Sequence, residues 1–369
     1  MAARPKKAKH SNIVMKRIGI LTSGGDCPGL NAVLRAASRT SEKLGFELIG
    51  FCDGFEGLLP PESHILLDRH ATSGIMHLGG TILGTVNRGQ FINRSGSRRM
   101  IQAEVLGKTR QTFQNLNLHG LIVVGGDGSL STAQLLHEAG FPVVGVPKTI
   151  DNDLEATSMT FGLNSAVECV AEALNRLHTT ATSHKRVMVL EVMGRHAGWI
   201  ALQGGLAGGA DIILLPEMPF EYEKVAAEIE HRHREGSKST LVVVAEGASP
   251  KDGKQSCQQT TTGERRLGGI SEIVAKEIAE RTGKEVRTCV LGHLQRGGGP
   301  TTLDRILATG FGVKAVELIA EGKFGSMVSY QNCTFVDVPI ASAVQKMRRV
   351  NPESQLVQIA RSVGISFGN

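Results

Sequence analysis

The chain has 369 residues, of which 41% are hydrophobic and 21% are charged. The length suggests two domains or one large one, and the composition excludes a mainly disordered protein. The net charge of +6 is concentrated at the N-terminus: the first 17 residues hold six Lys or Arg and no acid, which leaves 35 basic and 35 acidic residues in the rest. We therefore expect residues 1–14 to form a solvated, disordered basic tail; a nucleic-acid or membrane-surface arm is the weaker alternative.

The cysteine pattern and the hydropathy of the chain indicate the cellular compartment in which the protein is found. None of the six cysteines forms a C-x-x-C pair, and no apolar run approaches the ~18 residues needed to span a membrane. The N-terminus lacks the apolar core of a signal peptide. We therefore expect a cytoplasmic protein with reduced thiols and no membrane partner. With one Trp, two Tyr and twelve Phe, a stacking platform for nucleic acid is not expected either.

Short β-rich runs alternate with helical patterns along the whole chain. Strands are predicted, in chain order, at 17–21, 47–51, 121–124, 143–146, 187–192, 211–215, 241–245 and 287–291. Helices are predicted at about 29–44, 100–116, 129–139, 163–182, 222–235, 269–282 and 302–321. Several strands are continuous Val/Ile/Leu runs, as expected for parallel strands buried on both faces. The repeated βαβα order predicts an α/β fold with doubly wound, mainly parallel sheets.

Most of the unusual residues follow the predicted strands, at the edge where doubly wound sheets bind their ligands. Two glycine-rich turns, Gly24-Gly25 and the run 125–129, each join a strand to a helix. Glycines there let backbone N–H groups point at phosphate oxygens, and the helix N-terminus adds its dipole. Neither turn is a Walker A loop or a dinucleotide fingerprint. Asp127 lies between glycines and suits a magnesium nucleotide, since Mg²⁺ usually takes one or two carboxylates and substrate phosphates.

Two carboxylates, Asp151 and Asp153, follow the predicted strand 143–146. One can accept a proton from a hydroxyl nucleophile while the other lies near a metal; the alternative is an Asx-rich turn without chemistry. Glu246 follows the apolar run 241–245 and could accept hydrogen bonds from a sugar hydroxyl or cap a helix. The sequence has no H-E-x-x-H or G-x-S-x-G motif, which argues against a zinc enzyme and a serine hydrolase.

Cationic residues occur at or near several strand ends, and phosphate recognition favours Arg. They are Arg186, Arg195, Arg287, His293 and Arg296. In a body without net charge they favour an anionic substrate.

With these segments in order, the chain resembles the phosphofructokinase family, which phosphorylates fructose 6-phosphate at its 1-hydroxyl. The resemblance runs from about Lys16 to at least Thr309, and its markers are the runs 24–31, 79–81, 125–129, 148–153, 193–195 and 292–299. A Gly-Gly-Asp-Gly loop also occurs in NAD kinases and lipid kinases, but the runs 149–153 and 293–296 separate this chain from them.

The resemblance implies two Rossmann-like domains with the active site in the cleft between them. We expect residues 15–162 plus about 295–345 to form the nucleotide-binding domain. Residues 163–294 plus about 346–369 are expected to form the sugar-phosphate-binding domain.

The resemblance also implies catalytic roles. Asp151 is similar to the family's general base, which takes the proton from the sugar hydroxyl, and Thr149 and Arg195 to stabilisers of the transferring phosphoryl group. Asp127 is similar to the carboxylate that holds Mg²⁺, and Asp153 to a second carboxylate near the metal.

Binding residues are implied in the same way. Those for the donor are Gly25, Arg88, Gly126, Asp127, Gly128, Ser129 and Lys148. Arg88 comes one place after Asn87, where the simplest bacterial members have an Arg. Those for the sugar phosphate are Thr149, Ile150, Asp151, Met193, Gly194, Arg195, Glu246, His293, Leu294, Gln295 and Arg296. Arg186 and Arg287 would reach the 6-phosphate from a neighbouring subunit, which implies a homo-oligomer, typically a tetramer in this family.

An allosteric site is implied by weaker matches. Positions that bind a nucleotide effector in bacterial members are occupied by Arg35, Arg39 and Arg69, with Asp211 in place of a Glu. Ser237 and His178 replace a lysine and an arginine of that site, so the resemblance does not fix the effector.

The donor is predicted from two positions that disagree. In this family Gly at position 128 goes with ATP and Asp with diphosphate, because an Asp side chain would occupy the space of the nucleotide α-phosphate and repel it; Gly leaves that space open and uncharged. Lys148 points the other way, since diphosphate users carry Lys there. We expect ATP with Mg²⁺ as the donor, and keep a diphosphate-dependent enzyme of the same fold as the alternative. A non-catalytic relative that binds sugar phosphate is disfavoured because Asp127, Asp151 and Arg195 are all present.

Overall fold

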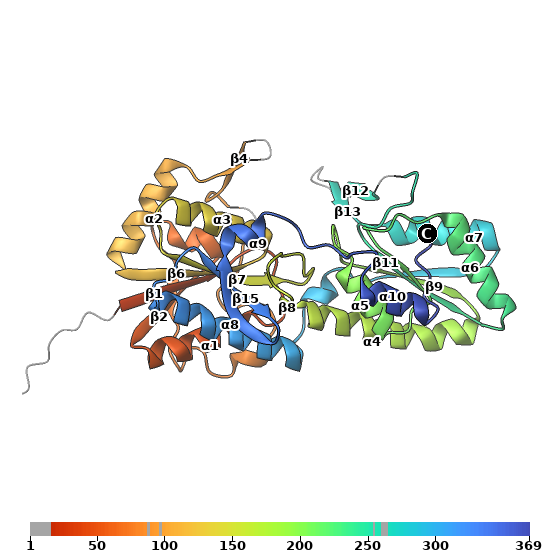
Figure 1. Ribbon diagram of the computed structural model, residues 1–369, viewed down its shortest axis with the longest axis horizontal. Coiled ribbons are helices and arrows are strands. Elements are labelled where there is room, and N and C mark those ends of the chain that lie inside the picture. Colours follow the sequence, from red (N-terminus) through yellow and green to blue (C-terminus); the bar gives the residue numbers. More distant parts are fainter. Residues whose placement is uncertain (1–15, 87–88, 96–97, 254, 260–264) are drawn as a thin grey trace, which may run out of the picture.

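The structure is a computed structural model that describes residues 16–369 except 87–88, 96–97, 254 and 260–264. The predicted basic tail, residues 1–14, lies outside the described residues. The chain forms two α/β bodies that lie side by side along the long axis of the molecule (Figure 1). Each is built on a mainly parallel sheet with helices on both faces, which confirms the predicted fold class.

The first body contains an eight-stranded sheet with the order β16-β15-β7-β6-β1-β2-β3, and β8 pairs with β7. Its strands are β1 (Lys16–Thr22), β2 (Phe46–Phe51), β3 (His64–Leu66), β6 (Leu118–Gly125), β7 (Val143–Thr149), β8 (Phe161–Gly162), β15 (Ser326–Gln331) and β16 (Thr334–Pro339). The central strands pair in parallel, whereas β3 and β16 are antiparallel at the two edges.

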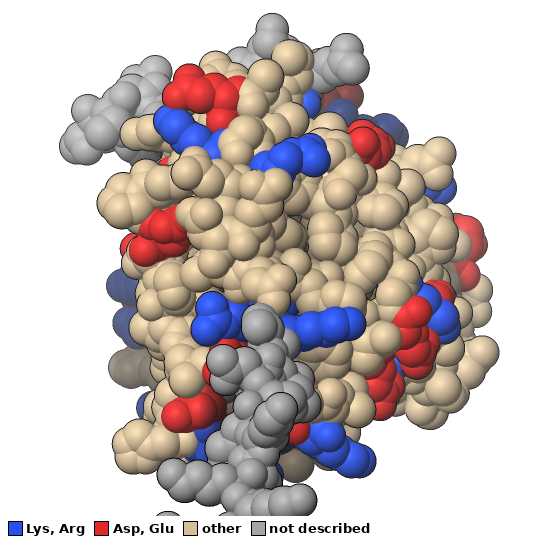
Figure 2. Space-filling view, turned by 90° about the vertical axis from the view of Figure 1, so that its left-hand side faces the viewer, with Lys and Arg blue, Asp and Glu red and all other residues tan. Residues whose placement is uncertain are grey.

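Helices cover both faces of this sheet because the central strands are apolar on both sides. On one face lie α1 (Leu30–Lys43) and α8 (Thr302–Ala320); on the other lie α2 (Ala103–Asn115), α3 (Asp127–Glu138) and the short α9 (Ile340–Val344). Gly29 enters α1 with φ 111°, a left-handed conformation that glycine adopts without strain. The face of this body in Figure 2 carries basic and acidic side chains interspersed.

The second body contains a four-stranded parallel sheet with the order β10-β11-β9-β14. Its strands are β9 (Val187–Val192), β10 (Ile212–Leu214), β11 (Thr240–Ala245) and β14 (Val286–Val290). One face is covered by α4 (Leu163–His184), α5 (Trp199–Ala207) and α10 (Gln355–Ser362), and the other by α6 (Tyr222–Arg234) and α7 (Ile270–Thr282).

Shorter elements complete the chain. They are the 3₁₀ turns η1 (Gly54–Leu58), η2 (Ile75–His77) and η3 (Gly292–Arg296), and the hairpins β4 (Asn93–Ser95)–β5 (Arg98–Met100) and β12 (Cys257–Gln259)–β13 (Arg265–Leu267). The two hairpins project on the same side of the molecule, one from each body (Figure 1). Among the described residues, no helix combines the length and apolar character needed to cross a membrane.

The chain crosses between the bodies three times, and buried polar contacts fix the crossings. At the start of α8, the buried Asp304 accepts hydrogen bonds from the backbone N–H of Ser165 (2.7 Å) and from its hydroxyl (2.6 Å), at the start of α4. Near the last crossing, the Trp199 indole donates to the carbonyl of Arg348 at 3.3 Å. These contacts hold the carboxyl ends of the two sheets near each other, and the candidate site lies there.

Candidate active site

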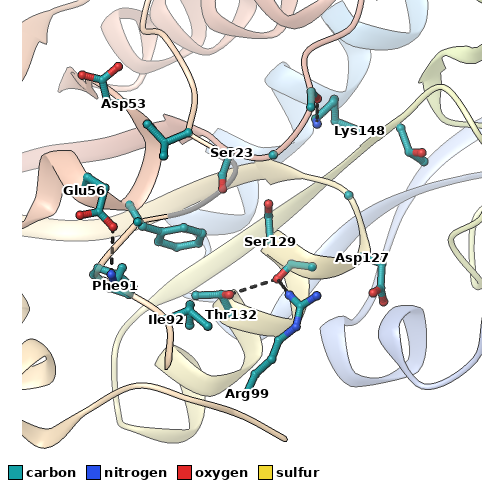
Figure 3. A pocket seen from close by; sticks show the side chains of 18 of the residues that line it. Ser23, Asp53, Glu56, Phe91, Ile92, Arg99, Asp127, Ser129, Thr132 and Lys148 are labelled. Atoms are coloured by element: carbon teal, nitrogen blue, oxygen red, sulfur yellow. Dashed lines mark hydrogen bonds between the residues drawn. The ribbon is translucent and has the colours of Figure 1, made fainter. Parts of the chain in front are cut away.

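A pocket of about 750 Å³ lies at the carboxyl ends of the strands of the first sheet (Figure 3). Its walls come mainly from the loops after β1 and β6, from the end of β7, and from the segments after β2 and before β4; Arg195 and Arg296 reach it from the second body. Many of the predicted site residues line it: Gly25, Gly126, Asp127, Gly128, Ser129, Lys148, Thr149, Arg195 and Arg296. Arg88 lies outside the described residues.

The turn between β6 and α3 is the phosphate-binding candidate. Gly126 is the N-cap of α3, and Asp127 is its first residue. A Cβ on Gly125 would lie 2.2 Å from the Cβ of Ser129, so only glycine fits where the chain turns into the helix. The helix N-terminus presents backbone N–H groups and a positive dipole end to the pocket, which is an environment suited to phosphate.

Lys148, near the end of β7, contacts the loop after β1. Its side chain is buried and its ammonium donates to the carbonyl of Gly25. Burial lowers the pKa of Lys148, and the carboxylates of Asp26 and Asp151 act in the opposite direction. The ammonium is thus placed where a donor phosphate would meet the Gly24-Gly25 turn.

Arg296, from the second body, also contacts the loop after β1. One of its guanidinium nitrogens, Nη1, donates to the carbonyl of Asp26 at 3.0 Å. A Cβ on Gly25 would lie 2.8 Å from that nitrogen. The absence of a side chain at position 25 therefore lets the guanidinium approach the backbone.

The two carboxylates after β7 are buried without full hydrogen bonding. Within the described residues, Oδ1 of Asp151 and Oδ1 of Asp153 have no hydrogen-bond partner. Burial, and secondarily the neighbouring Asp153, raises the pKa of Asp151 to about 7. Burial also raises the pKa of Asp153; the nearby Asp127 acts in the same direction, and a hydrogen bond with Thr149 opposes it. Unsatisfied buried carboxylates are rare in folded proteins and indicate a place for a proton, a hydroxyl or a cation.

The residues present fit a magnesium ion that is bound together with a phosphate. Asp127 and Asp153 are close enough for their charges to interact, and Asp153 has an orphaned oxygen. No group of three or more His, Cys, Asp or Glu within the described part of the chain is arranged to hold a metal by itself. A site with one or two carboxylates, completed by phosphate oxygens and water, is the usual arrangement for Mg²⁺.

The predicted sugar-phosphate residues follow the strands of the second sheet. Met193, Gly194 and Arg195 follow β9, Glu246 follows β11, and His293 to Arg296 form η3 after β14. Burial raises the pKa of Glu246, while a backbone hydrogen bond from Gly194 lowers it. Gly194 has φ 138°, and a Cβ there would lie 2.9 Å from the carbonyl of Ala197, so glycine is required for this turn.

Among the predicted sugar-phosphate residues that do not line the pocket are Ile150, Leu294 and Gln295. The side chain of Ile150 is buried in the core. Gln295 is buried and supports the turn after β9, because its side-chain oxygen accepts a hydrogen bond from the N–H of Met193 at 3.3 Å. The side chain of Leu294 is 69% exposed on the surface.

Arg186 and Arg287 lie at the amino-terminal ends of β9 and β14, away from the carboxyl ends of these strands. Arg186 directly precedes β9, Arg287 is the second residue of β14, and both form ion pairs with Glu285. From Arg287 to Leu291 the extended chain covers roughly 13 Å. Within one chain these two arginines are therefore separated from Arg195 and Arg296.

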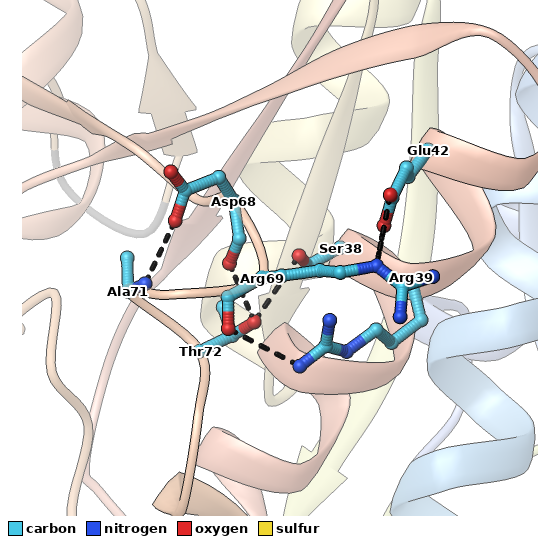
Figure 4. Close-up of polar contacts among 7 residues, drawn as sticks. All are labelled: Ser38, Arg39, Glu42, Asp68, Arg69, Ala71 and Thr72. Atoms are coloured by element: carbon cyan, nitrogen blue, oxygen red, sulfur yellow. Dashed lines mark hydrogen bonds and ion pairs between the residues drawn. The ribbon is translucent and has the colours of Figure 1, made fainter.

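The predicted allosteric residues are divided between the two bodies. Arg35 and Arg39 lie on α1; Arg39 donates to the carbonyl of Arg69 at 3.2 Å, and Arg69 pairs with Glu42 (Figure 4). In the second body, Asp211 forms an ion pair with Arg232 and accepts a hydrogen bond from the N–H of Leu241 at 2.8 Å. Asp211 thus belongs to a different surface from the three arginines.

Sequence reasoning missed the far end of the pocket. It is lined by apolar side chains from η1 and from the loop before β4, and by Arg99 of β5; the apolar residues are Phe55, Val86, Phe91 and Ile92. Nη1 of Arg99 lies 2.6 Å from the position of a Cβ on Gly128. The expectation of open, uncharged space beside Gly128 was therefore wrong: a guanidinium fills it. No local motif marks Arg99, because the β4–β5 hairpin is short and its run Asn93–Met100 lacks an apolar alternation.

Comparisons with known proteins show what the chain is similar to. The family model described as Phosphofructokinase matches residues 17–319. The chain is 49% identical over 354 residues to an ATP-dependent 6-phosphofructokinase of Chloroflexus aurantiacus, covering 96% of this chain and 98% of the relative. It is also 46% identical over 357 residues to a pyrophosphate–fructose 6-phosphate 1-phosphotransferase of Streptomyces coelicolor, covering 95% of this chain and all of the relative.

A solved phosphofructokinase structure is also similar to this chain. The phosphofructokinase of Pichia pastoris in the T-state superimposes with a TM-score of 0.80 at 29% identity, covering 98% of this chain. The chain spans only 38% of the length of that larger protein. With the match of the family model and the identity to full-length relatives, these findings show that the chain belongs to the phosphofructokinase family.

Proposed function

We propose that this protein transfers a phosphoryl group from MgATP to the 1-hydroxyl of D-fructose 6-phosphate, giving fructose 1,6-bisphosphate and ADP. The main observation in favour of ATP as the donor is that one end of the pocket is apolar. Beyond Gly128 the cavity continues to Phe55, Phe91 and Ile92, and its total volume is about 750 Å³. An inorganic diphosphate has no apolar group that could pack against this wall, whereas a nucleoside can bury its base there.

Asp151 acts as the general base in this proposal. Its buried Oδ1 has no partner within the described residues, and its pKa of about 7 is close to the operating pH. General bases are most effective when their pKa lies near that pH. The carboxylate would take the proton from the 1-hydroxyl as that oxygen attacks the terminal phosphorus of the donor.

The transferring group is held by cations and by the β6–α3 turn. Arg195 and Thr149 line the pocket from two sides, and Lys148 lies beside the Gly24-Gly25 turn. In phosphoryl transfer, catalysis is mainly positioning and electrostatic stabilisation, so fixed cations are the expected machinery. Asp127 and Asp153 would hold Mg²⁺, which supplies charge neutralisation for the phosphates when it is bound.

The assembly is proposed to be a homo-oligomer, a tetramer as is typical of the family, in the cytoplasm. Support comes from the exposed apolar side chains Val290, Leu294 and Ile306, which suit contact with a second copy. The position of Arg186 and Arg287, away from their own pocket, supports a site shared between subunits. The described cysteines are all unpaired, as is usual in a reducing compartment.

A diphosphate-dependent reaction at the same site is the second candidate, favoured by Lys148 and by the name of the Streptomyces relative. The test is a donor comparison: purified protein is given fructose 6-phosphate with MgATP or with magnesium diphosphate, and fructose 1,6-bisphosphate is measured. We expect turnover with ATP. Turnover with diphosphate and none with ATP would overturn the proposal in favour of the second candidate.

A further inference from the structure

Arg99 is anchored on the first turn of α3. Its Nη1 donates to the carbonyl of Gly128 at 2.5 Å, and the hydroxyl of Thr132 donates to the same carbonyl at 3.0 Å. The guanidinium forms part of the pocket wall, as Figure 3 shows. One hydrogen bond leaves most of its five N–H donors for other partners.

The guanidinium lies directly beside residue 128. A Cβ built on Gly128 would be 2.6 Å from Nη1 and 2.9 Å from Nη2. Asp127 lies on one side of the Arg99 guanidinium, and Phe91 and Ile92 lie on the other (Figure 3). A donor that extends from Asp127 to the apolar wall must therefore pass the guanidinium of Arg99.

We propose that Arg99 is a donor-selecting residue, whose guanidinium contacts the α-phosphate of a nucleoside triphosphate. This inference rests on the proposed function. The terminal phosphates are held near Asp127, Lys148 and the Gly24-Gly25 turn, so the group that crosses Gly128 is the phosphate that carries the nucleoside. Inorganic diphosphate ends before this point and gains nothing from Arg99.

Residue 128 and Arg99 form a coupled pair. The end of an Arg side chain can move, so an Asp at position 128 would displace the guanidinium and pair with it. Such a pair would withdraw the cation from the donor in addition to placing a negative charge beside the α-phosphate. Gly128 therefore favours ATP in this chain by leaving Arg99 available.

The test compares Arg99→Ala, Arg99→Lys and a control, Arg110→Ala. Arg110 lies on the exposed surface of α2, where it bonds to the carbonyl of Ala139 and stacks over Phe141 outside the pocket. We expect Arg99→Ala to raise the KM for ATP about tenfold or more, with kcat and the KM for fructose 6-phosphate within about twofold of wild type. Arg99→Lys should recover part of the loss, because it keeps the charge without the planar fork. Arg110→Ala should match wild type.

Binding is measured separately by calorimetry with ADP and with inorganic diphosphate. Arg99→Ala should weaken ADP about tenfold and leave diphosphate unchanged. If the wild type uses ATP but Arg99→Ala keeps its KM for ATP and its affinity for ADP, the inference on Arg99 is overturned and the proposed function stands. If the wild type does not use ATP at all, the proposed function itself has failed.

A double-mutant cycle tests the coupling. Gly128→Asp should raise the KM for ATP by a larger factor in the wild-type background than in the Arg99→Ala background, because only the former has a cation to lose. Equal factors in both backgrounds would show that residue 128 acts independently of Arg99.

Discussion

The guanidinium of Arg296 donates a 3.0 Å hydrogen bond to the backbone carbonyl of Asp26, although the two residues are 270 positions apart. Arg296 belongs to η3 of the second body, and Asp26 to the loop after β1 of the first. The contact therefore joins the candidate sugar-phosphate residues to the loop that would carry the donor phosphates.

Replacing Arg296 should affect the sugar phosphate most. We predict that Arg296→Ala raises the KM for fructose 6-phosphate by about 10- to 100-fold, since charge-assisted hydrogen bonds are worth about 1.5–3 kcal/mol. Arg176→Ala, an exposed residue paired with Glu172 on α4, is the matched control. Steady-state kinetics with each substrate varied in turn measures the two KM values. An unchanged KM for the sugar phosphate would show that Arg296 does not bind it.

Asp304 should matter for stability rather than for chemistry. Its buried carboxylate accepts two hydrogen bonds from Ser165 at the N-terminus of α4, so its removal leaves these donors without a partner. We predict that Asp304→Ala lowers the free energy of unfolding by about 2–3 kcal/mol. Urea denaturation measures this, and Ser165→Ala should lose less because the backbone N–H bond remains. A loss below about 0.5 kcal/mol for Asp304→Ala would contradict the role given to this contact.

The strands and helices that define both sheets follow from local patterns in the sequence. All eight predicted strands coincide with observed ones, including the buried runs of β6, β9 and β11, because parallel strands covered on both faces are continuously apolar. Three helices were missed, namely α5, α9 and α10. The run of α5, WIALQGGLA, is apolar with two glycines and so gives no amphipathic period. The β15–β16 hairpin was also missed, since its turn places Asn332 and Cys333 at positive φ without the usual glycine.

Many residues that line the pocket could be predicted from the sequence, but their spatial arrangement could be predicted only in part. Gly125–Ser129 and Thr149–Asp153 are contiguous runs, so their chemistry can be read locally. Arg99 is 29 positions from Gly128, to whose carbonyl it donates a hydrogen bond, and no local pattern at either residue predicts this contact. Arg186 and Arg287 are at the amino-terminal ends of β9 and β14, and because these strands pair in parallel both residues lie at the end of the sheet away from the pocket of their own chain.

A shared site makes a prediction about mixed oligomers. We predict that Arg287→Ala and Asp151→Asn are each poorly active alone, and that subunits mixed by denaturation and reassembly regain activity. Sites that combine a wild-type Asp151 with a wild-type Arg287 from another subunit explain the gain. Arg186→Ala should complement Asp151→Asn in the same way. If reassembled mixtures show only the sum of the parental activities, Arg186 and Arg287 do not serve a neighbouring site.

The raised pKa of Asp151 should destabilise the fold at neutral pH. The folded-state pKa is about 7 against an ordinary value of 3.8. Between these values the unfolded chain loses the proton while the folded chain keeps it, so the free energy of unfolding falls as the pH rises through this range. We predict that Asp151→Asn unfolds at a higher temperature than the wild type at pH 8, and that the difference shrinks toward pH 4. A difference independent of pH would show that Asp151 is not perturbed.

The most direct test of the central claim is the rate at which the terminal phosphate of γ-labelled ATP moves to fructose 6-phosphate in wild type and in Asp151→Asn. The amide keeps the size of the side chain but cannot take the proton, and general base catalysis contributes about 10²–10⁴-fold. We predict that the wild type forms labelled fructose 1,6-bisphosphate with a kcat that rises through pH 7. Asp151→Asn should lose about 10²-fold or more in kcat while it binds ADP and fructose 6-phosphate with nearly unchanged affinity. A variant that turns over at close to the wild-type rate would contradict the assignment of Asp151 as the base.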